Sequence, residues 1–297
     1  MGLASSCLPT PASQQSPSHA DRSRRAAAWT LPPAMERRAA VAAASQRGAF
    51  AKLSDWLRAS GAVTSGVKIE FYSESVRGVH AARDIAPHKR IITIPHACLI
   101  TDQMARETPL GQRIQKIATE LTAPKHCQLT CYILSMRERG DSFPRAFFDV
   151  LPTDIDSFPL LWDATALSSL EASSVVHEID ARRAAHRSDF DRIIAVAPEM
   201  ERFGFDAFLW ARVMVGSRNF SIVIGGKKCT AMVPLADMLN DAGHARDTAW
   251  TFDDSLDAFT VTSLHPIATG SQITDSCVTC ILKSDELSLS HELTGWG

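Results

Sequence analysis

Apolar residues recur at helical spacing where the chain first shows a regular pattern, between residues 48 and 60. The apolar positions of this stretch are Phe50, Leu53, Trp56 and Leu57. Gly61 follows at the place where a left-handed glycine commonly ends a helix. The pattern therefore predicts a short amphipathic helix ahead of the first strands.

Two short runs rich in β-branched residues come next, Val67–Phe71 and Ile91–Ile94. Arg77-Gly78 is typical of a turn between them, and Pro95 would end the second run because it cannot donate to a sheet ladder. We predict two strands of one small sheet.

The pattern becomes helical between Asp102 and Val215. A nearly continuous apolar run, Cys127–Met136, predicts a buried helix. Asp163 is a good N-cap for a second helix that runs into the charged segment 180–191, and a third is expected at about 206–215. This block is interpreted as a helical insertion or subdomain.

Strands then return in two pairs, each joined by turn residues. The four segments are Ser221–Ile224, Cys229–Val233, Ala249–Phe252 and Ala258–Val261. The first pair flanks Gly225-Gly226 and the second flanks residues 253–255, which predicts two hairpins. Strands, helices and strands again indicate an α+β fold in which one sheet is assembled from distant pieces.

Composition narrows the class of protein. The chain has 297 residues, 45% hydrophobic content and a net charge of −2, with Lys+Arg and Asp+Glu nearly balanced. Such a surface lacks the basic footprint that nucleic acid requires, so we expect no nucleic-acid partner. No apolar run is long enough for a membrane span. Seven cysteines, an odd number, favour free thiols over a disulfide framework.

Residues 1–45 are rich in Ser, Pro, Ala and Arg and lack apolar periodicity, so we predict a disordered N-terminal extension. The same composition suits an organellar transit peptide. The start also fits N-myristoylation of Gly2, with Ser6 at the expected offset and Cys7 as a second acylation site. The compartment therefore stays open between the cytoplasm and an organelle, chloroplast or mitochondrion.

Three motifs carry the candidate chemistry: VRGVHAARDI at 76–85, SRNF at 217–220 and PLADMLND at 234–241. The last places Asp237 and Asn240 in a turn directly after an apolar strand, which is typical of a binding site. With FPRAFFDVLP at 143–152, the three motifs resemble the SET-domain protein methyltransferases. The resemblance is to the branch of Rubisco large-subunit lysine methyltransferase and its actin-histidine relatives, over about residues 48–276.

The resemblance implies a SET fold of small β-sheets with a large helical insertion and a truncated or divergent C-terminal part. The SET domain would span 46–280, with halves at about 66–101 and 216–276 around an insertion at about 102–215. Residues 281–297 would be a divergent tail. We expect a monomer.

The resemblance further implies S-adenosylmethionine as the cofactor and a lysine, or a histidine, of a non-histone protein as the methyl acceptor. Such transfer needs a narrow channel that fixes geometry and excludes water, rather than a strong acid or a metal. The implied cofactor-binding residues are Arg77, Gly78, Val79, Arg218, Asp237, Met238, Leu239, Asn240 and Asp241. Lys89 to Ile91 stand where relatives often add further cofactor contacts.

Each motif has an implied role and an ordinary structural alternative. Gly78 would let the backbone approach the methionine end of the cofactor, although Val76 replaces the glycine usual before this motif. Arg218 would reach the cofactor carboxylate, and Asn240 would hold its amino group and adenine. Asp241 replaces the histidine of the family pattern. Taken singly, the motifs also fit a plain strand turn, a solvated arginine and a capping turn.

The end of the chain departs from the family. The catalytic tyrosine is expected where Cys277 stands, and a thiol cannot supply a rigid phenol, so we predict that position 277 is non-functional and turnover impaired. The helical substrate-binding domain of relatives is not seen after this point. Either the tail is unrelated sequence, as a splicing or frame error would produce, or the protein is a degenerate enzyme. The alternative function is an inactive SET-fold binding protein.

No metal is expected. Cys277-x-x-Cys280 and the helical pair Cys127 and Cys131 are unpaired half-sites, and buried cysteine is a common small apolar residue.

Overall fold

A computed structural model gives the structure of residues 33–73, 76–139, 145–153, 158–170 and 173–276, with side chains from residue 45 onward. The chain divides into two compact units, residues 1–41 and 42–297, and all described elements except the start of the first helix lie in the second unit. The acylation and transit-peptide predictions for the N-terminus, and those for Cys277, Cys280 and the tail, lie outside the described residues.

Helix α2, Pro33–Ala59, begins well before the predicted start at residue 48 and enters the extension predicted to be disordered. The segment 39–44 is alanine apart from Val41, and alanine has the strongest intrinsic helix propensity. The predicted end is confirmed, because Gly61 adopts φ 88° just after the helix.

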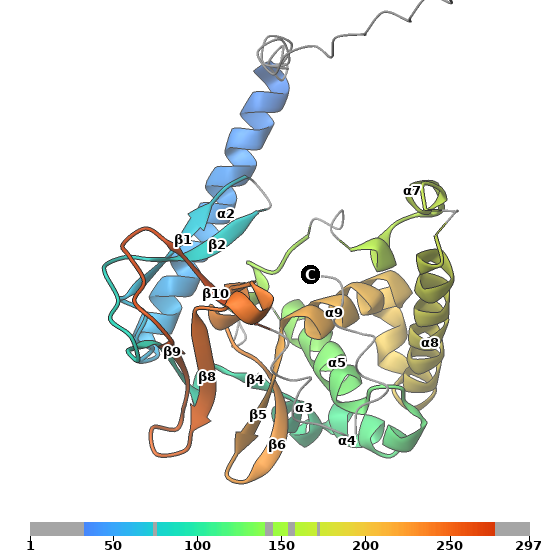
Figure 1. Ribbon diagram of the computed structural model, residues 1–297. Helices are drawn as coiled ribbons and strands as arrows, with labels where there is room; N and C mark the ends of the chain where they lie inside the picture. The colour runs from blue at the N-terminus through green and yellow to red at the C-terminus, as the bar shows by residue number, and fades with distance from the viewer. Residues whose placement is uncertain (1–32, 74–75, 140–144, 154–157, 171–172, 277–297) are drawn as a thin grey trace, which may run out of the picture. The chain divides into compact units, whose positions relative to one another are not determined.

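The strands form three small sheets, labelled in Figure 1. The first has the order β1-β2-β10-β7, with bounds Val67–Phe71, Arg77–Ala81, Gln272–Asp275 and Asn240–Asp241. The second has the order β3-β9-β8, with bounds Arg90–Pro95, Ala258–Ser263 and Thr248–Asp253. The third has the order β4-β6-β5, with bounds Ile100–Thr101, Lys227–Met232 and Asn219–Ile224.

Two predictions about the first strands are wrong. β1 and β3 lie in different sheets, and Arg77-Gly78 is not a turn but the beginning of β2, where Arg77 pairs with Phe71. The chain reverses earlier, where the backbone N–H of Tyr72 donates to the carbonyl of Val76 at 2.8 Å. Strand propensity shows where strands form, but pairing depends on contacts between distant segments.

Both predicted hairpins are confirmed, β5–β6 and β8–β9. Gly225 and Gly226 have positive φ at the first turn, and Asp257 has φ 47° at the second. The prediction of one common sheet is wrong, because β6 also pairs with β4 whereas β9 pairs with β3. Each sheet nevertheless joins an early strand to a late one, so the α+β organisation is confirmed.

Along the chain, a block of helices separates β4 from β5. They are α3 Asp102–Glu107, α4 Pro109–Gln115, α5 Pro124–Glu138, α6 Arg145–Phe148, α7 Ala164–Ser168, α8 Val175–Val196 and α9 Gly204–Arg218. The buried helix is confirmed as α5. The helix predicted after Asp163 is two helices: the Asp163 carboxylate accepts from the backbone N–H of Ala166 at 2.8 Å and caps α7, and α8 begins later.

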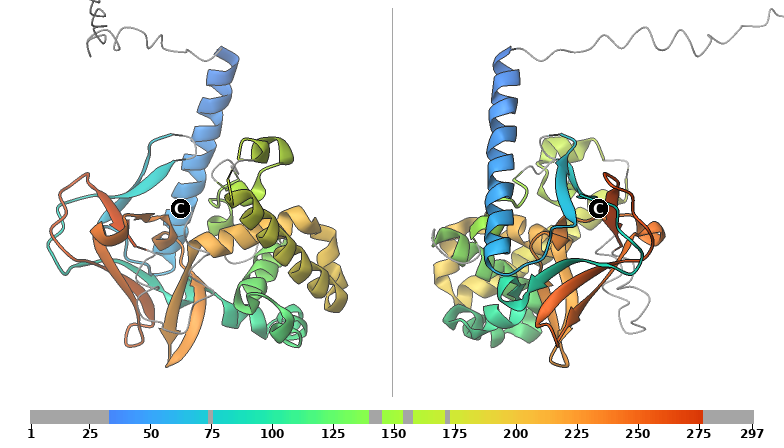
Figure 2. Two further views of the ribbon diagram at one scale, coloured as in Figure 1. Left: turned by 45° about the vertical axis from the view of Figure 1, so that its right-hand side comes forward. Right: turned by 90° about the vertical axis from the view of Figure 1, so that its left-hand side faces the viewer.

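Two apolar cores hold the second unit together. One lies between the sheets and includes Leu53 and Leu57 of α2. The other lies among α5, α8 and α9, where the Phe190 and Phe208 rings are 5.1 Å apart. Figures 1 and 2 show these three helices gathered on one side of the strands. α9 packs in the helical core, and its last residue, Arg218, directly precedes β5 of the third sheet.

Across the part of the chain that the structure describes, none of the helices has the length and apolar character needed to cross a bilayer. The same residues contain no group of three His, Cys, Asp or Glu side chains placed to hold a metal ion. The described cysteines are buried free thiols: Cys98, Cys127, Cys131 and Cys229.

Candidate functional site

Arg218 and Asp237 form a buried ion pair between the end of α9 and the short helix η5, Ala236–Met238. The Arg218 Nη1 atom lies 3.0 Å from Asp237 Oδ2 and 3.2 Å from the Asp237 carbonyl oxygen. The Asp237 side chain is fully buried, and 15% of the Arg218 side chain is exposed. Burial raises the pKa of Asp237, and Arg218 opposes that rise.

Arg77, at the start of β2, is the second cation of this region. Its Nη2 donates to the carbonyl of Val150 at 3.3 Å, and its guanidinium carbon lies 4.7 Å from the Phe50 ring centroid. Burial, and then the charge of Arg218, lower the pKa of Arg77 to about 10. Asp237 opposes this shift, which places all three charged groups in one neighbourhood.

Asn240 connects the third motif to the first. Its Nδ2 donates to the backbone carbonyl of Arg77 at 3.1 Å. The sequence predicts a turn at Asn240, but this prediction is wrong. Asn240 and Asp241 form the short strand β7, which pairs in parallel with Thr274 and Asp275 of β10. The structure thus brings residues from three distant motifs to one place.

We call Arg77, Arg218, Asp237 and Asn240 the arginine cluster. It contains two guanidinium groups and one carboxylate, so its formal charge is positive whether or not Asp237 is ionised. Arg77 Nε, Arg218 Nε and Asp237 Oδ1 are buried and make no hydrogen bond within the described protein. A small anionic group with further hydrogen-bonding atoms, such as an amino-acid carboxylate and its amine, fits this set of charges and donors.

The other predicted cofactor residues are near the cluster, but not all can offer side chains. Val79 is fully buried and Met238 is 4% exposed, and both side chains belong to the core between the sheets. Leu239 is half-buried and also packs against that core, whereas the side chain of Asp241 accepts from the backbone N–H of Gly243 at 3.3 Å. Val79 and Met238 could therefore contact a ligand mainly through their backbone.

Gly78 is a close-approach glycine, but the structure shows a protein group at its open side. A Cβ atom there would collide with the hydroxyl of Tyr72 and lie 3.1 Å from Gln272 Nε2. The Tyr72 hydroxyl is 2.6 Å from His80 Nε2, and His80 Nδ1 is 2.7 Å from the Gly270 carbonyl. Because that carbonyl can only accept, Nδ1 donates to it and the Tyr72 hydroxyl donates to Nε2.

Sequence reasoning missed two residues that hold Arg77 in place, Phe50 and Val150. Phe50 appears in the sequence only as one apolar position of a helix, and nothing in that pattern indicates a cation–π contact. Val150 lies in the FPRAFFDVLP segment that accompanies the motifs, which was the available signal. Sequence reasoning also missed Tyr72 as the neighbour of Gly78. It predicts the turn at Arg77-Gly78, whereas the chain reverses between Tyr72 and Val76.

Lys89 to Ile91 do not join the arginine cluster. Ile91 is buried beside a separate pocket, whose lining includes none of the cluster residues. Position 277 lies outside the described residues; β10, which pairs with β7, ends two positions earlier in sequence, at Asp275.

No family model matches the chain. Among curated proteins, it is similar to actin-histidine N-methyltransferase of Gallus gallus, with 25% identity over 235 residues. The corresponding protein of Mus musculus is 24% identical over 235 residues. Each alignment covers 75% of this chain and 39% of the relative, so the chain spans well under half the length of these relatives.

Solved structures give the fold. The SET domain of LSMT bound to lysine and AdoHcy superposes with a TM-score of 0.64 at 19% identity, covering 77% of this chain and 54% of that chain. Rubisco LSMT bound to AdoMet gives a TM-score of 0.63 at 22% identity, covering 83% and 56%. The chain therefore has the SET fold, and the resemblance inferred from its motifs is confirmed.

Proposed function

We propose that this chain, a SET-fold relative of the actin-histidine and Rubisco methyltransferases, is an S-adenosylmethionine-dependent protein methyltransferase. The observation that carries the proposal is the arginine cluster. Arg218 pairs with the buried carboxylate of Asp237, the half-buried guanidinium of Arg77 lies in the same electrostatic neighbourhood, and Asn240 hydrogen-bonds the first motif. Distant segments of the chain converge there on charges and donors that suit the amino-acid end of the cofactor.

Each cluster residue has a separate part in this proposal. Arg218 and Arg77 supply positive charge for the cofactor carboxylate, and Asp237 fixes the Arg218 guanidinium so that little rotamer entropy is lost on binding. Asn240 holds the start of β2 through the Arg77 carbonyl and keeps its side-chain oxygen for a donor on the ligand. The cofactor supplies an activated methyl group, and the protein's task is to orient it and exclude water.

The acceptor in this proposal is a side-chain nitrogen of a non-histone protein. The relatives support a lysine or a histidine, since one is named for histidine of actin and another is bound to lysine. Purified actin and Rubisco, incubated with the chain and tritium-labelled S-adenosylmethionine, are the first acceptors to test. If neither protein is labelled, either the alternative below or another acceptor is favoured. Calorimetry with S-adenosylhomocysteine separates both of these cases from a chain that has no cofactor site, because only the latter gives no binding heat.

The alternative is an inactive SET-fold protein that binds the cofactor or a peptide without turnover. Cys277 favours it, because cysteine stands where the resemblance expects the catalytic tyrosine. Impaired turnover is thus part of the proposal, and the compartment is left to experiment.

Replacing Asn240 by alanine is expected to weaken binding of S-adenosylhomocysteine about tenfold. The substitution removes one side-chain hydrogen bond to the Arg77 carbonyl and one acceptor for the ligand, together worth about 1.4 kcal/mol. Isothermal titration calorimetry on the full chain measures the change. Gln103→Ala, on the exposed face of α3, is the matched control and should bind as the unaltered protein does. Equal affinity for both variants would exclude Asn240 from the site.

Restoring the family sequence at the end of the domain is expected to raise turnover. The double substitution Cys277→Tyr and Val278→Gly returns the tyrosine and following glycine of relatives, and a positioned hydroxyl contributes on the order of a hundredfold in rate. Methyl incorporation into actin and Rubisco is the measurement, with Cys277→Phe and Val278→Gly as a control that lacks the hydroxyl. If the restored variant binds S-adenosylhomocysteine but transfers no faster, the missing tyrosine is not what limits turnover.

A further inference from the structure

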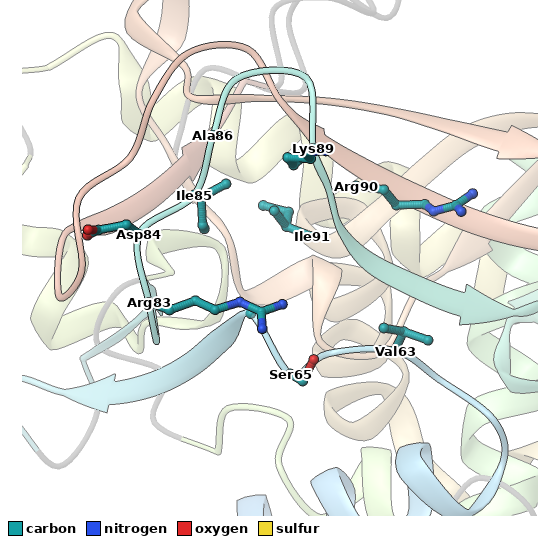
Figure 3. A pocket seen from close by; sticks show the side chains of 10 residues that line it. Val63, Ser65, Arg83, Asp84, Ile85, Ala86, Lys89, Arg90 and Ile91 are labelled. Carbon is teal, nitrogen blue, oxygen red and sulfur yellow. The ribbon is translucent and has the colours of Figure 1, made fainter.

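A pocket lies next to the segments that flank the β1–β2 hairpin, and Figure 3 shows its lining. It has a volume of about 290 Å³ and is built from two segments, residues 63–66 and 83–91. None of the arginine-cluster residues lines it. Its ligand would therefore be held independently of the proposed methyl transfer.

The floor of this pocket is apolar and firmly held. Ile85 is 6% exposed and Ile91 5% exposed, and Figure 3 shows the two side chains facing each other. Ile85 exchanges backbone hydrogen bonds of 2.9 Å with Ile267, and the Gly66 carbonyl accepts from Ala82 at 3.0 Å. A pocket whose walls are joined by backbone hydrogen bonds keeps its shape without a ligand, so binding costs little ordering.

Arg83 and Lys89 give the pocket positive charge. The Arg83 guanidinium lies beside Gly66, 3.8 Å from where a Cβ would be, and Figure 3 shows it extending toward Ser65 below the isoleucines. The only carboxylate in the lining, Asp84, is already engaged, because it accepts from the backbone N–H and hydroxyl of Thr269 at 2.8 and 2.6 Å. No ion pair to Arg83 or Lys89 occurs among the described residues.

We propose that this pocket binds an acidic segment of a partner protein. A carboxylate side chain would lie against Arg83 and Lys89, and a neighbouring aliphatic side chain would contact Ile85 and Ile91. The volume suits one or two side chains, and the apolar floor gives no advantage to an inorganic anion. The chain's net charge of −2 disfavours a long polyanion such as nucleic acid.

Lys227, exposed on the β5–β6 hairpin and outside the lining, provides a control of the same charge, whereas Arg90 lines the pocket together with Arg83 and Lys89. In Figure 3 the Arg90 side chain extends away from the two isoleucines, and its charge helps to lower the pKa of Asp253, after the hydrogen bonds that Ser255 and Leu256 make. Removing the charge of Lys227 changes the net charge as much as removing that of Arg83 does. If the peptide binds specifically in the pocket, the Arg83 variant should lose more affinity than the Lys227 variant. If general surface charge attracts the peptide, the two variants should lose the same affinity.

The test is fluorescence anisotropy of a fluorescein-labelled peptide, Gly-Glu-Leu-Glu-Ile-Glu-Gly, titrated with the full chain at low salt. We expect saturable binding that Arg83→Gln and Lys89→Gln each weaken about fivefold, as expected for one partly exposed charge pair. Lys227→Gln, outside the lining, should change the affinity less than twofold. The same peptide with glutamine in place of glutamate should not bind.

Three results would overturn the proposal. They are the absence of saturable binding, equal binding of the glutamine peptide, and equal loss in the Arg83→Gln and Lys227→Gln variants. Circular dichroism melting of every variant guards against misfolding, and Ile91→Ala offers a second probe of the floor. Competition by inorganic phosphate as strongly as by unlabelled peptide would assign the pocket to simple anions and also count against a protein ligand.

Discussion

Replacing Arg218 by methionine is expected to lower the free energy of unfolding by about 3 kcal/mol and to remove measurable binding of S-adenosylhomocysteine. The Asp237 side chain is fully buried, and its Oδ2 lies 3.0 Å from Arg218 Nη1. Removing one partner of a buried pair leaves a carboxylate without compensation, which costs about 3–5 kcal/mol. Arg77 remains nearby and Asp237 can protonate, so the lower end of that range is expected.

The stability effect and the binding effect can be separated with a second substitution. In Arg218→Met combined with Asp237→Asn, the buried carboxylate is gone, so most of the lost free energy of unfolding should return. Binding should stay absent, because the cation for the ligand carboxylate is still missing. Urea unfolding and calorimetry on both variants are the measurements. A double variant that regains both stability and affinity would show that Arg218 acts only on the fold.

Acidification from pH 7 to pH 5 is expected to lower the free energy of unfolding by about 2 kcal/mol for each of two histidines, His126 and His186. Burial lowers the pKa of His186 to about 3 and that of His126 to about 4, and the nearby charge of Arg212 adds to both shifts. Arg182 lowers the pKa of His186 further. For His126, Asp102 opposes the shift whereas Lys125 adds to it.

The free energy of unfolding falls on acidification because the unfolded state binds protons at a higher pH than the folded state. In the unfolded chain both histidines titrate near pH 6.5, whereas in the folded protein they stay neutral until about pH 3 to 4. As the pH falls below about 6.5, the unfolded state takes up protons that the folded state refuses. The stability contribution is therefore complete above the unfolded pKa and is lost progressively as the pH approaches the folded values.

Urea unfolding at several pH values between 7 and 5 tests this, before most carboxylates titrate. His186→Gln should remove about half of the pH dependence, because glutamine keeps a polar group on α8 without a titrating proton. His177→Gln, at an exposed position on the same helix, is the matched control and should leave the pH dependence unchanged. Parallel pH profiles for His186→Gln and the unaltered chain would show that this histidine is not the source.

Much of the candidate site could be predicted from the sequence because its motifs are short and local. Arg218, Asp237 and Asn240 were identified from residue type and order along the chain, and the structure brings them to one place. The role of Gly78 was harder to predict. Its close neighbour is Tyr72, from the other strand of the hairpin, and a turn placed at Arg77-Gly78 hides that contact. Lys89 to Ile91 stand where relatives often add cofactor contacts, which stays a prediction; in the structure they line a pocket that includes none of the arginine-cluster residues.

The sequence by itself determined where most elements form, because helix periodicity, caps and hairpin glycines act over a few residues. The Gly61 helix end, the two hairpins and the buried α5 are decided at that range. Only the tertiary structure decided which strands pair and which charges meet. β2 joins β10 and Arg77 approaches Arg218 across more than a hundred residues, and such contacts follow from packing two cores together, which no local pattern encodes.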